Sequence, residues 1–142
     1  MATFALAVLL LPATAFDLVR RRIPNRLTVT GLLLGLLWHV VDGRGMGLAF
    51  SLGGIGVAGL ALLLWLAGGL GAGDVKLFAA IGAWMGPLFL LWTMTGTIFG
   101  AGLLALGLVL HRGTKKGRMP LAPAIAAGAV YAYLRLHLGE MP

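Results

Sequence analysis

Residues 47–70 read GLAFSLGGIGVAGLALLLWLAGGL, a stretch without a single charged side chain. A helix needs roughly 20 apolar residues to cross the ~30 Å hydrocarbon core of a bilayer, and this stretch is long enough. Residues 87–110, PLFLLWTMTGTIFGAGLLALGLVL, form a second stretch of the same kind. Both predict membrane-spanning helices.

The composition agrees with a membrane protein. Of the 142 residues, 60% are hydrophobic and only 11% are charged, which excludes an ordinary water-soluble globule. The net charge of +7 does not indicate a nucleic-acid partner, because the basic residues lie between apolar runs and not on a folded module. There is no cysteine and the three histidines are far apart in the sequence, so we expect no disulfide, no metal site and no cofactor.

Six apolar segments divide the chain. They run from Ala2 to Phe16, Leu27 to Val41, Gly47 to Leu70, Val75 to Met85, Pro87 to Leu110 and Leu121 to Leu138. The fourth is only about half a span long, and Gly86-Pro87 breaks the chain after it, because proline fixes φ and readily opens a helix. The sequence therefore predicts an all-α, polytopic membrane protein of about six transmembrane helices, with residues 1–142 forming a single transmembrane domain.

The positions of the basic residues predict the orientation. Nine of the eleven Lys and Arg residues fall in the loops after the first, third and fifth segments: Arg20, Arg21, Arg22, Arg26, Lys76, Arg112, Lys115, Lys116 and Arg118. Short cytoplasmic loops carry such an excess of positive charge. We therefore expect these loops inside, both termini outside, and a multi-pass location in the cytoplasmic (inner) membrane.

A cleavable signal peptide is the alternative for the first segment, since Ala13-Thr14-Ala15 resembles a cleavage site. No basic residue precedes the apolar run, and three consecutive arginines follow it. Those arginines would oppose translocation of the downstream chain, so we expect the first segment to be retained.

Glycine pairs four residues apart occur inside the predicted spans. They are Gly31/Gly35, Gly82/Gly86 and Gly96/Gly100. Small residues at this spacing let transmembrane helices approach closely, so we expect packing and no chemistry from them.

Two of the four carboxylate side chains need an explanation. Asp42 lies in a short turn-like loop and Glu140 lies beside the C-terminus, where ordinary surface roles suffice. Asp17 and Asp74 instead lie at the ends of apolar segments, where a buried carboxylate is costly unless it is paired or used. The predicted orientation places both at the cytoplasmic boundary, and the sequence leaves open whether their side chains meet.

Two meeting carboxylates would be able to hydrolyse a peptide bond. In low-dielectric surroundings they cannot both ionise, so one keeps a proton while the other takes a proton from water. The protonated member can then hydrogen-bond the oxyanion that forms on the peptide carbonyl. The alternative for Asp17 is an ordinary contact with Arg20 or Arg21, and for Asp74 it is the N-cap of the next helix.

A glycine-rich motif surrounds the second acid. Residues 71–76 read GAGDVK, in which Gly71 and Gly73 allow a sharp turn and leave room beside Asp74. Lys76 lies two positions further along and would point away from Asp74 on a regular helix. We expect it to anchor the helix at the interface, with tuning of the charge on the acid pair as the alternative.

The first acid begins another motif, which is the first in chain order, so that residues 71–76 form the second motif. Residues 17–27 read DLVRRRIPNRL, where Pro24 would end a continuing helix and Asn25 can cap the next one. Together the two motifs resemble the type IV prepilin peptidase family of membrane aspartic proteases, which also includes archaeal preflagellin peptidases. The family hallmarks are an Asp followed six residues later by Ile-Pro-Asn and a Gly-x-Gly-Asp-x-Lys that opens a later span. Residues 120–123, PLAP, are similar to the family's Pro-x-Gly-Pro, with Ala122 where glycine is usual.

The resemblance implies an aspartic endopeptidase that removes the short basic leader from prepilin-like proteins at the cytoplasmic membrane face. Asp17 and Asp74 would be its catalytic pair. The supporting residues would be Ile23, Pro24, Asn25, Gly71, Gly73, Lys76, Pro120 and Pro123. Larger members of the family carry a domain with paired cysteines and N-methylate the product, and because no cysteine is present here we expect the peptidase activity alone.

Two other functions are compatible with the residues. A small proton-coupled transporter or channel would use the same two aspartates, because membrane carboxylates often mark ion pathways. A structural membrane subunit packed through its glycines would use neither. The partners expected for the peptidase are a prepilin-like substrate and the lipid bilayer, and the sequence does not predict the oligomeric state.

Overall fold

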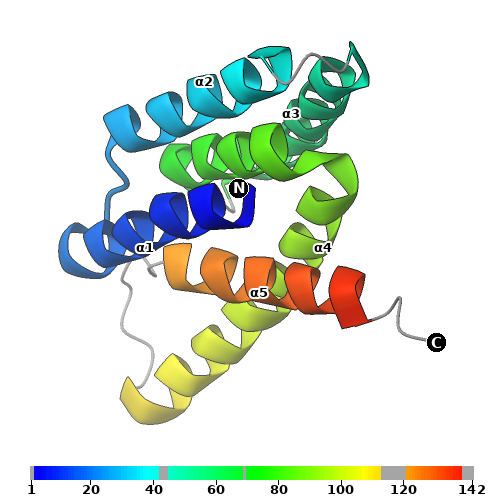
Figure 1. Ribbon diagram of the computed structural model, residues 1–142. Coiled ribbons are helices and arrows are strands. Elements are labelled where there is room, and N and C mark those ends of the chain that lie inside the picture. Colours follow the sequence, from blue (N-terminus) through cyan, green and yellow to red (C-terminus); the bar gives the residue numbers. More distant parts are fainter. Residues whose placement is uncertain (1, 42–44, 69, 113–120, 139–142) are drawn as a thin grey trace.

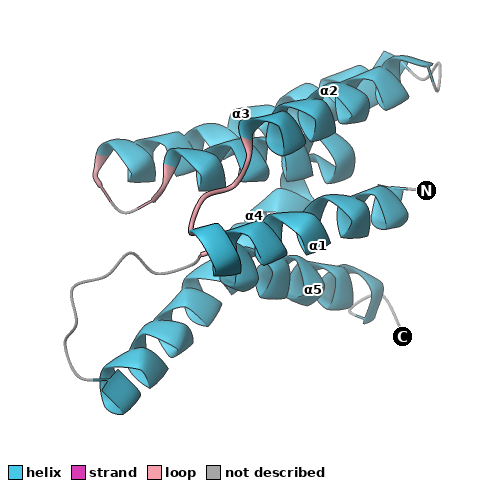
Figure 2. Cartoon of the chain, turned by 90° about the vertical axis from the view of Figure 1, so that its left-hand side faces the viewer, coloured by secondary structure: helices cyan, strands magenta, loops and turns pink. Residues whose placement is uncertain are grey.

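The computed structural model describes residues 2–41, 45–68, 70–112 and 121–138, and within them the chain is helical and contains no strand. The helices are α1 (Ala2–Arg20), α2 (Asn25–Val41), α3 (Gly45–Leu66), α4 (Ala72–Arg112) and α5 (Ala122–Leu138). Figure 1 shows the first half of α4 (green) beneath α2, with α1 and then α5 on its other side. Figure 2 shows the same order after a quarter turn, with α2 and α3 above and α1 and α5 below.

The surface of the bundle is strongly apolar. Within the part of the chain that the structure describes, three helical stretches are long and apolar enough to cross a membrane: Thr3–Arg20, Gly47–Leu66 and Ala72–Gly107. α2 is a shorter apolar helix. Large apolar side chains such as Phe4, Phe99 and Leu103 project from the bundle with about 70% or more of their surface exposed. The all-α class and the membrane character are therefore confirmed, whereas the count of six spans and the side of the termini stay predictions.

Helix ends differ from the apolar limits read from the sequence. α1 continues past Phe16 to Arg20, and α4 begins at Ala72 and not at Val75. The end of an apolar segment marks where lipid contact ends, but the backbone hydrogen bonding of the helix continues until the chain turns. α1 ends where Arg21 takes a left-handed conformation with φ of 51°. Both aspartates consequently lie inside helices and not in loops.

The fourth and fifth predicted segments are one helix with a break at the expected place. Gly86 has φ of 78° and ψ of −178°, a conformation that is open to glycine and strained for other residues. A Cβ atom at Gly86 would also collide with the ring of Phe50 on α3. In Figure 1 the chain turns at this point, and the second half of α4 (yellow) leaves the bundle beneath α5.

A side chain from α3 completes the hydrogen bonding at this break. In a regular helix the Ala83 carbonyl would accept a hydrogen bond from residue 87, but Pro87 has no N–H. The Ser51 hydroxyl, which is fully buried, donates to the Ala83 carbonyl over 2.7 Å. A polar group that lacks a partner in a membrane interior costs several kcal/mol, so Ser51 stabilises the broken form of α4.

His39 on α2 extends this polar contact. Its Nδ1 lies 2.9 Å from the Gly35 carbonyl and 3.0 Å from the Ser51 hydroxyl oxygen. A carbonyl only accepts hydrogen bonds, so Nδ1 carries the proton and donates to both oxygens. The chain of contacts links α2, α3 and the break in α4.

Glycines bring the main chains of neighbouring helices into contact. A Cβ atom at Gly54 would collide with the backbone of Gly82, and one at Gly96 would lie 2.8 Å from the Cα of Gly128. These contacts join α3 to the first half of α4 and join α5 to the second half. The packing role expected for Gly82 and Gly96 is therefore confirmed.

We predict that Ser51→Ala lowers the free energy of unfolding by about 1–3 kcal/mol, because it leaves the buried Ala83 carbonyl without its donor. Thr95→Ala is the matched control. The Thr95 hydroxyl donates to the Leu91 carbonyl of its own helix, which does not depend on it, so we expect a change within about 0.5 kcal/mol. Unfolding of both variants in detergent micelles, followed by circular dichroism, checks this, and equal losses would contradict the role of Ser51.

Candidate active site

Asp17 lies in the last turn of α1 and only 6% of its surface is exposed. Its Oδ2 accepts a hydrogen bond from the main-chain N–H of Ala122, the first residue of α5, over 2.8 Å. The partner is thus a backbone group from another helix. This contact differs from the ordinary cap against Arg20 or Arg21 that the sequence left open.

Asp74 lies in the first turn of α4 and is 7% exposed. The Gly71 carbonyl accepts from the N–H groups of Asp74 and Val75 over 3.0 and 3.3 Å, which makes Gly71 the N-cap residue. Asp74 Oδ2 accepts a hydrogen bond in return from the Gly71 N–H over 3.0 Å. The side-chain contact is half of a capping box, because Gly71 has no side chain with which to accept in return. Asp74 therefore caps α4 from the third helical position, and the N-cap interpretation is wrong in position.

The structure brings both aspartates into the wall of one cavity of about 810 Å³. The cavity lies between the end of α1, the connection to α2, the start of α4 and the residue before α5. Five of the predicted supporting residues line it: Ile23, Pro24, Asn25, Gly71 and Gly73. The apolar residues Phe16, Leu70 and Leu121 also line the cavity, and nothing in the sequence pointed to a site role for them. The cavity thus combines two carboxylates with apolar walls.

The two glycines of the second motif are needed for the close approach of its neighbours. A Cβ atom at Gly71 would lie 2.8 Å from Asp74 Oδ2, inside van der Waals distance. A Cβ atom at Gly73 would lie 3.3 Å from Cβ of Ile23, which belongs to the first motif. The glycine spacing thus makes room for the capping carboxylate on one side and for the first motif on the other.

A side-chain hydrogen bond ties the two motifs together. The Lys76 ammonium group donates to Oδ1 of Asn25 over 2.9 Å. The sequence suggested an interfacial anchor for Lys76, and the structure shows that its long side chain reaches the start of α2. The bond holds the beginnings of α2 and α4 side by side at the cavity.

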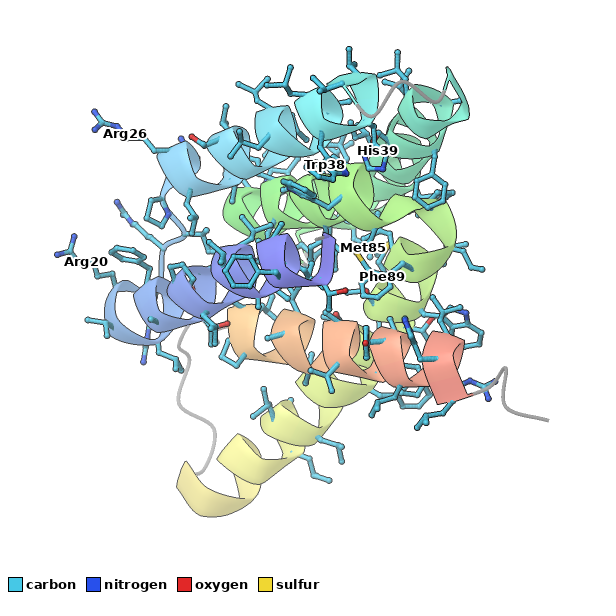
Figure 3. All side chains as sticks on the ribbon, in the orientation of Figure 1. Arg20, Arg26, Trp38, His39, Met85 and Phe89 are labelled. Atoms are coloured by element: carbon cyan, nitrogen blue, oxygen red, sulfur yellow. The ribbon has the colours of Figure 1, made fainter. Side chains whose placement is uncertain are left out.

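Basic residues surround the carboxylates. Arg20, Arg21 and Arg22 line the cavity, and the guanidinium group of Arg20 lies 5.9 Å from the ring centre of Phe16. Figure 3 shows Arg20 and Arg26 projecting from the same end of the molecule, while Trp38 and His39 lie towards the other end of α2. Three of the nine basic residues predicted for one membrane face thus lie around the aspartates, whereas Lys115, Lys116 and Arg118 lie outside the described residues.

The remaining predicted residues lie beside the cavity or cannot be placed. Pro123 is in the first turn of α5 and does not line the cavity, and Pro120 lies outside the described residues, as do Asp42 and Glu140. Among the residues that the structure describes, no three His, Asp or Glu side chains gather into a group that could hold a metal ion. The main-chain donor of Ala122 was not predicted, and only the PLAP sequence around it pointed to this region.

Comparisons with known proteins agree with these motifs. The sequence model of the type IV leader peptidase family matches residues 4–110. The prepilin leader peptidase/N-methyltransferase of Aeromonas salmonicida (strain A449) is 34% identical over 151 aligned positions, which cover 94% of this chain and 49% of that protein. The Escherichia coli O78:H11 protein named type 4 prepilin-like proteins leader peptide-processing enzyme is 30% identical over 92% of this chain and 50% of its own length.

A Bacillus subtilis (strain 168) protein, also named prepilin leader peptidase/N-methyltransferase, is 42% identical over 72 residues, which are 47% of this chain and 27% of that protein. The chain spans about half the length, or less, of these curated relatives. No solved structure matches the chain significantly.

We predict that Gly71→Ala lowers the free energy of unfolding by about 0.5–2 kcal/mol, because its Cβ displaces the carboxylate that caps α4. Gly59→Ala is the matched control in α3, where an added Cβ meets nothing within 4 Å. This change should instead stabilise the helix by up to about 1 kcal/mol through the higher helix propensity of alanine. Thermal unfolding of both variants in micelles shows whether each is less or more stable than the wild-type protein. A stabilised Gly71→Ala protein would contradict the capping geometry.

Proposed function

Because the chain belongs to the type IV leader peptidase family, we propose that it is a membrane aspartic endopeptidase that removes the leader peptide from prepilin-like proteins. The relatives are named for this activity, and the chain aligns with about half of their length. None of these comparisons supports the transporter or channel alternative. Membership of a peptidase family also leaves no support for a purely structural subunit.

The observation that carries the proposal is the cavity that Asp17 and Asp74 share. The two residues are far apart in sequence and come from opposite ends of their helices, α1 and α4. Both are more than nine-tenths buried, yet both reach the cavity wall. A pair of carboxylates in such surroundings is suited to acid–base chemistry, and we assign the catalytic roles to these two residues.

The proposed reaction is hydrolysis with one carboxylate ionised and the other protonated. The ionised group takes a proton from a water molecule, and the water oxygen forms a bond to the peptide carbonyl carbon. The protonated group hydrogen-bonds the oxyanion that results. When the C–N bond breaks, a proton passes to the leaving nitrogen, so the products are a carboxyl end on the leader and an amino end on the mature protein.

The proposed setting follows from the charge distribution. We place the cavity at the cytoplasmic face of the inner membrane, because the arginines of the α1–α2 connection surround it. A substrate whose leader lies in the cytosol and whose next segment lies in lipid would meet the cavity at its cleavage point. The six spans, both termini outside and a single transmembrane domain over residues 1–142 belong to this proposal.

We further propose that leader removal here occurs without methyl transfer. The support is that the 142 residues contain no cysteine, whereas the larger methylating members of the family carry paired cysteines. We assign supporting roles to Gly71 and Gly73 and to Lys76 with its partner Asn25. The prolines of the 17–27 and 120–123 sequences, which are Pro24, Pro120 and Pro123, are assigned supporting roles as well.

We predict that Asp17→Asn and Asp74→Asn each lower the rate of leader removal by at least about 1,000-fold, since neither amide can exchange a proton as a carboxyl group does. Each purified variant is incubated with a purified prepilin that the wild-type protein cleaves, and loss of the leader is followed by mass spectrometry.

Glu140→Gln removes a carboxylate near the C-terminus and should cleave at the wild-type rate. Circular dichroism shows whether each variant is folded. Cleavage by a folded Asp17→Asn or Asp74→Asn protein within tenfold of the wild-type rate would rule out the proposed catalytic pair.

A further inference from the structure

The first N–H group of α5 is directed at a carboxylate on α1. The Leu121 carbonyl accepts the first hydrogen bond of α5, from Ile125 N–H over 2.9 Å, so Leu121 is the N-cap and Ala122 the first helical residue. An N–H group at this position has no partner inside its own helix. Here its partner is Asp17 Oδ2 at 2.8 Å, in a contact that is buried from solvent.

The sequence at the start of α5 reduces the number of other N–H donors beside that of Ala122. Pro123, the second helical residue, has no N–H, so Ala122 and Ala124 supply the N–H groups of the first three helical positions. The positive end of the helix dipole lies at the same place and favours a negative charge there. The start of α5 therefore offers Asp17 both a hydrogen bond and a favourable field.

Close packing makes the contact specific. Ala122 is completely buried, and α5 packs against α1 along this region. Leu121, the residue before it, lines the same cavity as Asp17. One oxygen of the Asp17 carboxylate is thus fixed by α5, while the side chain remains in the cavity wall that it shares with Asp74.

We propose that the main-chain N–H of Ala122 is a positioning group for Asp17 in the reaction. It touches no reacting atom and acts through the carboxylate, whose orientation it sets by holding one of its two oxygens. The inference rests on the proposed function, because it assigns a role within that site. It also gives the start of α5 a physical purpose, which is to deliver the Ala122 N–H to the end of α1.

The test replaces one atom. Ala122 is exchanged for lactic acid, its α-hydroxy counterpart, during cell-free synthesis into lipid nanodiscs, which converts the N–H into an ester oxygen and keeps the methyl group. With a prepilin that the wild-type protein cleaves, we expect kcat to fall about 10- to 100-fold, the scale of a misplaced catalytic group, and KM to stay within about twofold.

The matched control is the same exchange at Ala129 in the middle of α5, whose N–H serves the helix ladder. Each ester weakens one carbonyl acceptor and removes one N–H donor. If kcat falls in the ester at position 122 and not in the ester at position 129, the loss is due to the contact with Asp17.

Hydrogen exchange provides a readout that does not need the ester protein to fold. The Ala122 amide should be protected in the wild-type protein and in Asp17→Asn, whose amide oxygen still accepts, and should exchange at least about tenfold faster in Asp17→Ala. Unchanged protection in Asp17→Ala, or an unchanged kcat in the 122 ester, overturns the positioning role. If Asp17→Asn itself still cleaves, the assignment of Asp17 to the catalytic pair fails instead. If the wild-type protein cleaves no prepilin, the proposed function fails, so these failures are distinguishable from that of the positioning role.

Discussion

A backbone N–H at the start of a helix holds each of the two buried aspartates, and the architecture around the cavity follows from these two contacts. The start of α4 provides the Gly71 N–H for Asp74, and the start of α5 provides the Ala122 N–H for Asp17. Helix starts lack partners for their first N–H groups, and buried carboxylates lack water, so each satisfies the other. The arrangement leaves both acidic groups lining one cavity.

The break in α4 fits the same requirement. A straight helix of this length would carry its second half past α5, whereas the turn at Gly86 lets α5 pack on the second half while its start reaches α1. A break inside a membrane leaves a carbonyl without a donor, and Ser51 supplies that donor from α3. The contact is remote from the cavity but fixes the helix that carries Asp74.

Much of this arrangement could be predicted from the sequence, because charge and proline are local signals. The placement of Asp17 and Asp74 at one boundary follows from the basic loops, and the break follows from Gly86-Pro87. That both side chains line one cavity depends on helix packing, which the sequence leaves open. The contact between Lys76 and Asn25 could not be predicted, since periodicity gives the direction of a Cα–Cβ bond and not the reach of a long side chain. The Ala122 donor was equally hidden, because every residue except proline has a backbone N–H and only the fold selects one.

The backbone contact between Gly54 and Gly82 constrains how this sequence can diverge. Each glycine faces the main chain of the other. A side chain added at one of them would collide with backbone atoms of its partner, and no substitution at the partner can make its backbone smaller. A larger residue has to be absorbed by sliding α3 along the half of α4 that bears Asp74. Compensating mutations should therefore arise elsewhere on the interface between those helices, and the two glycines should not covary.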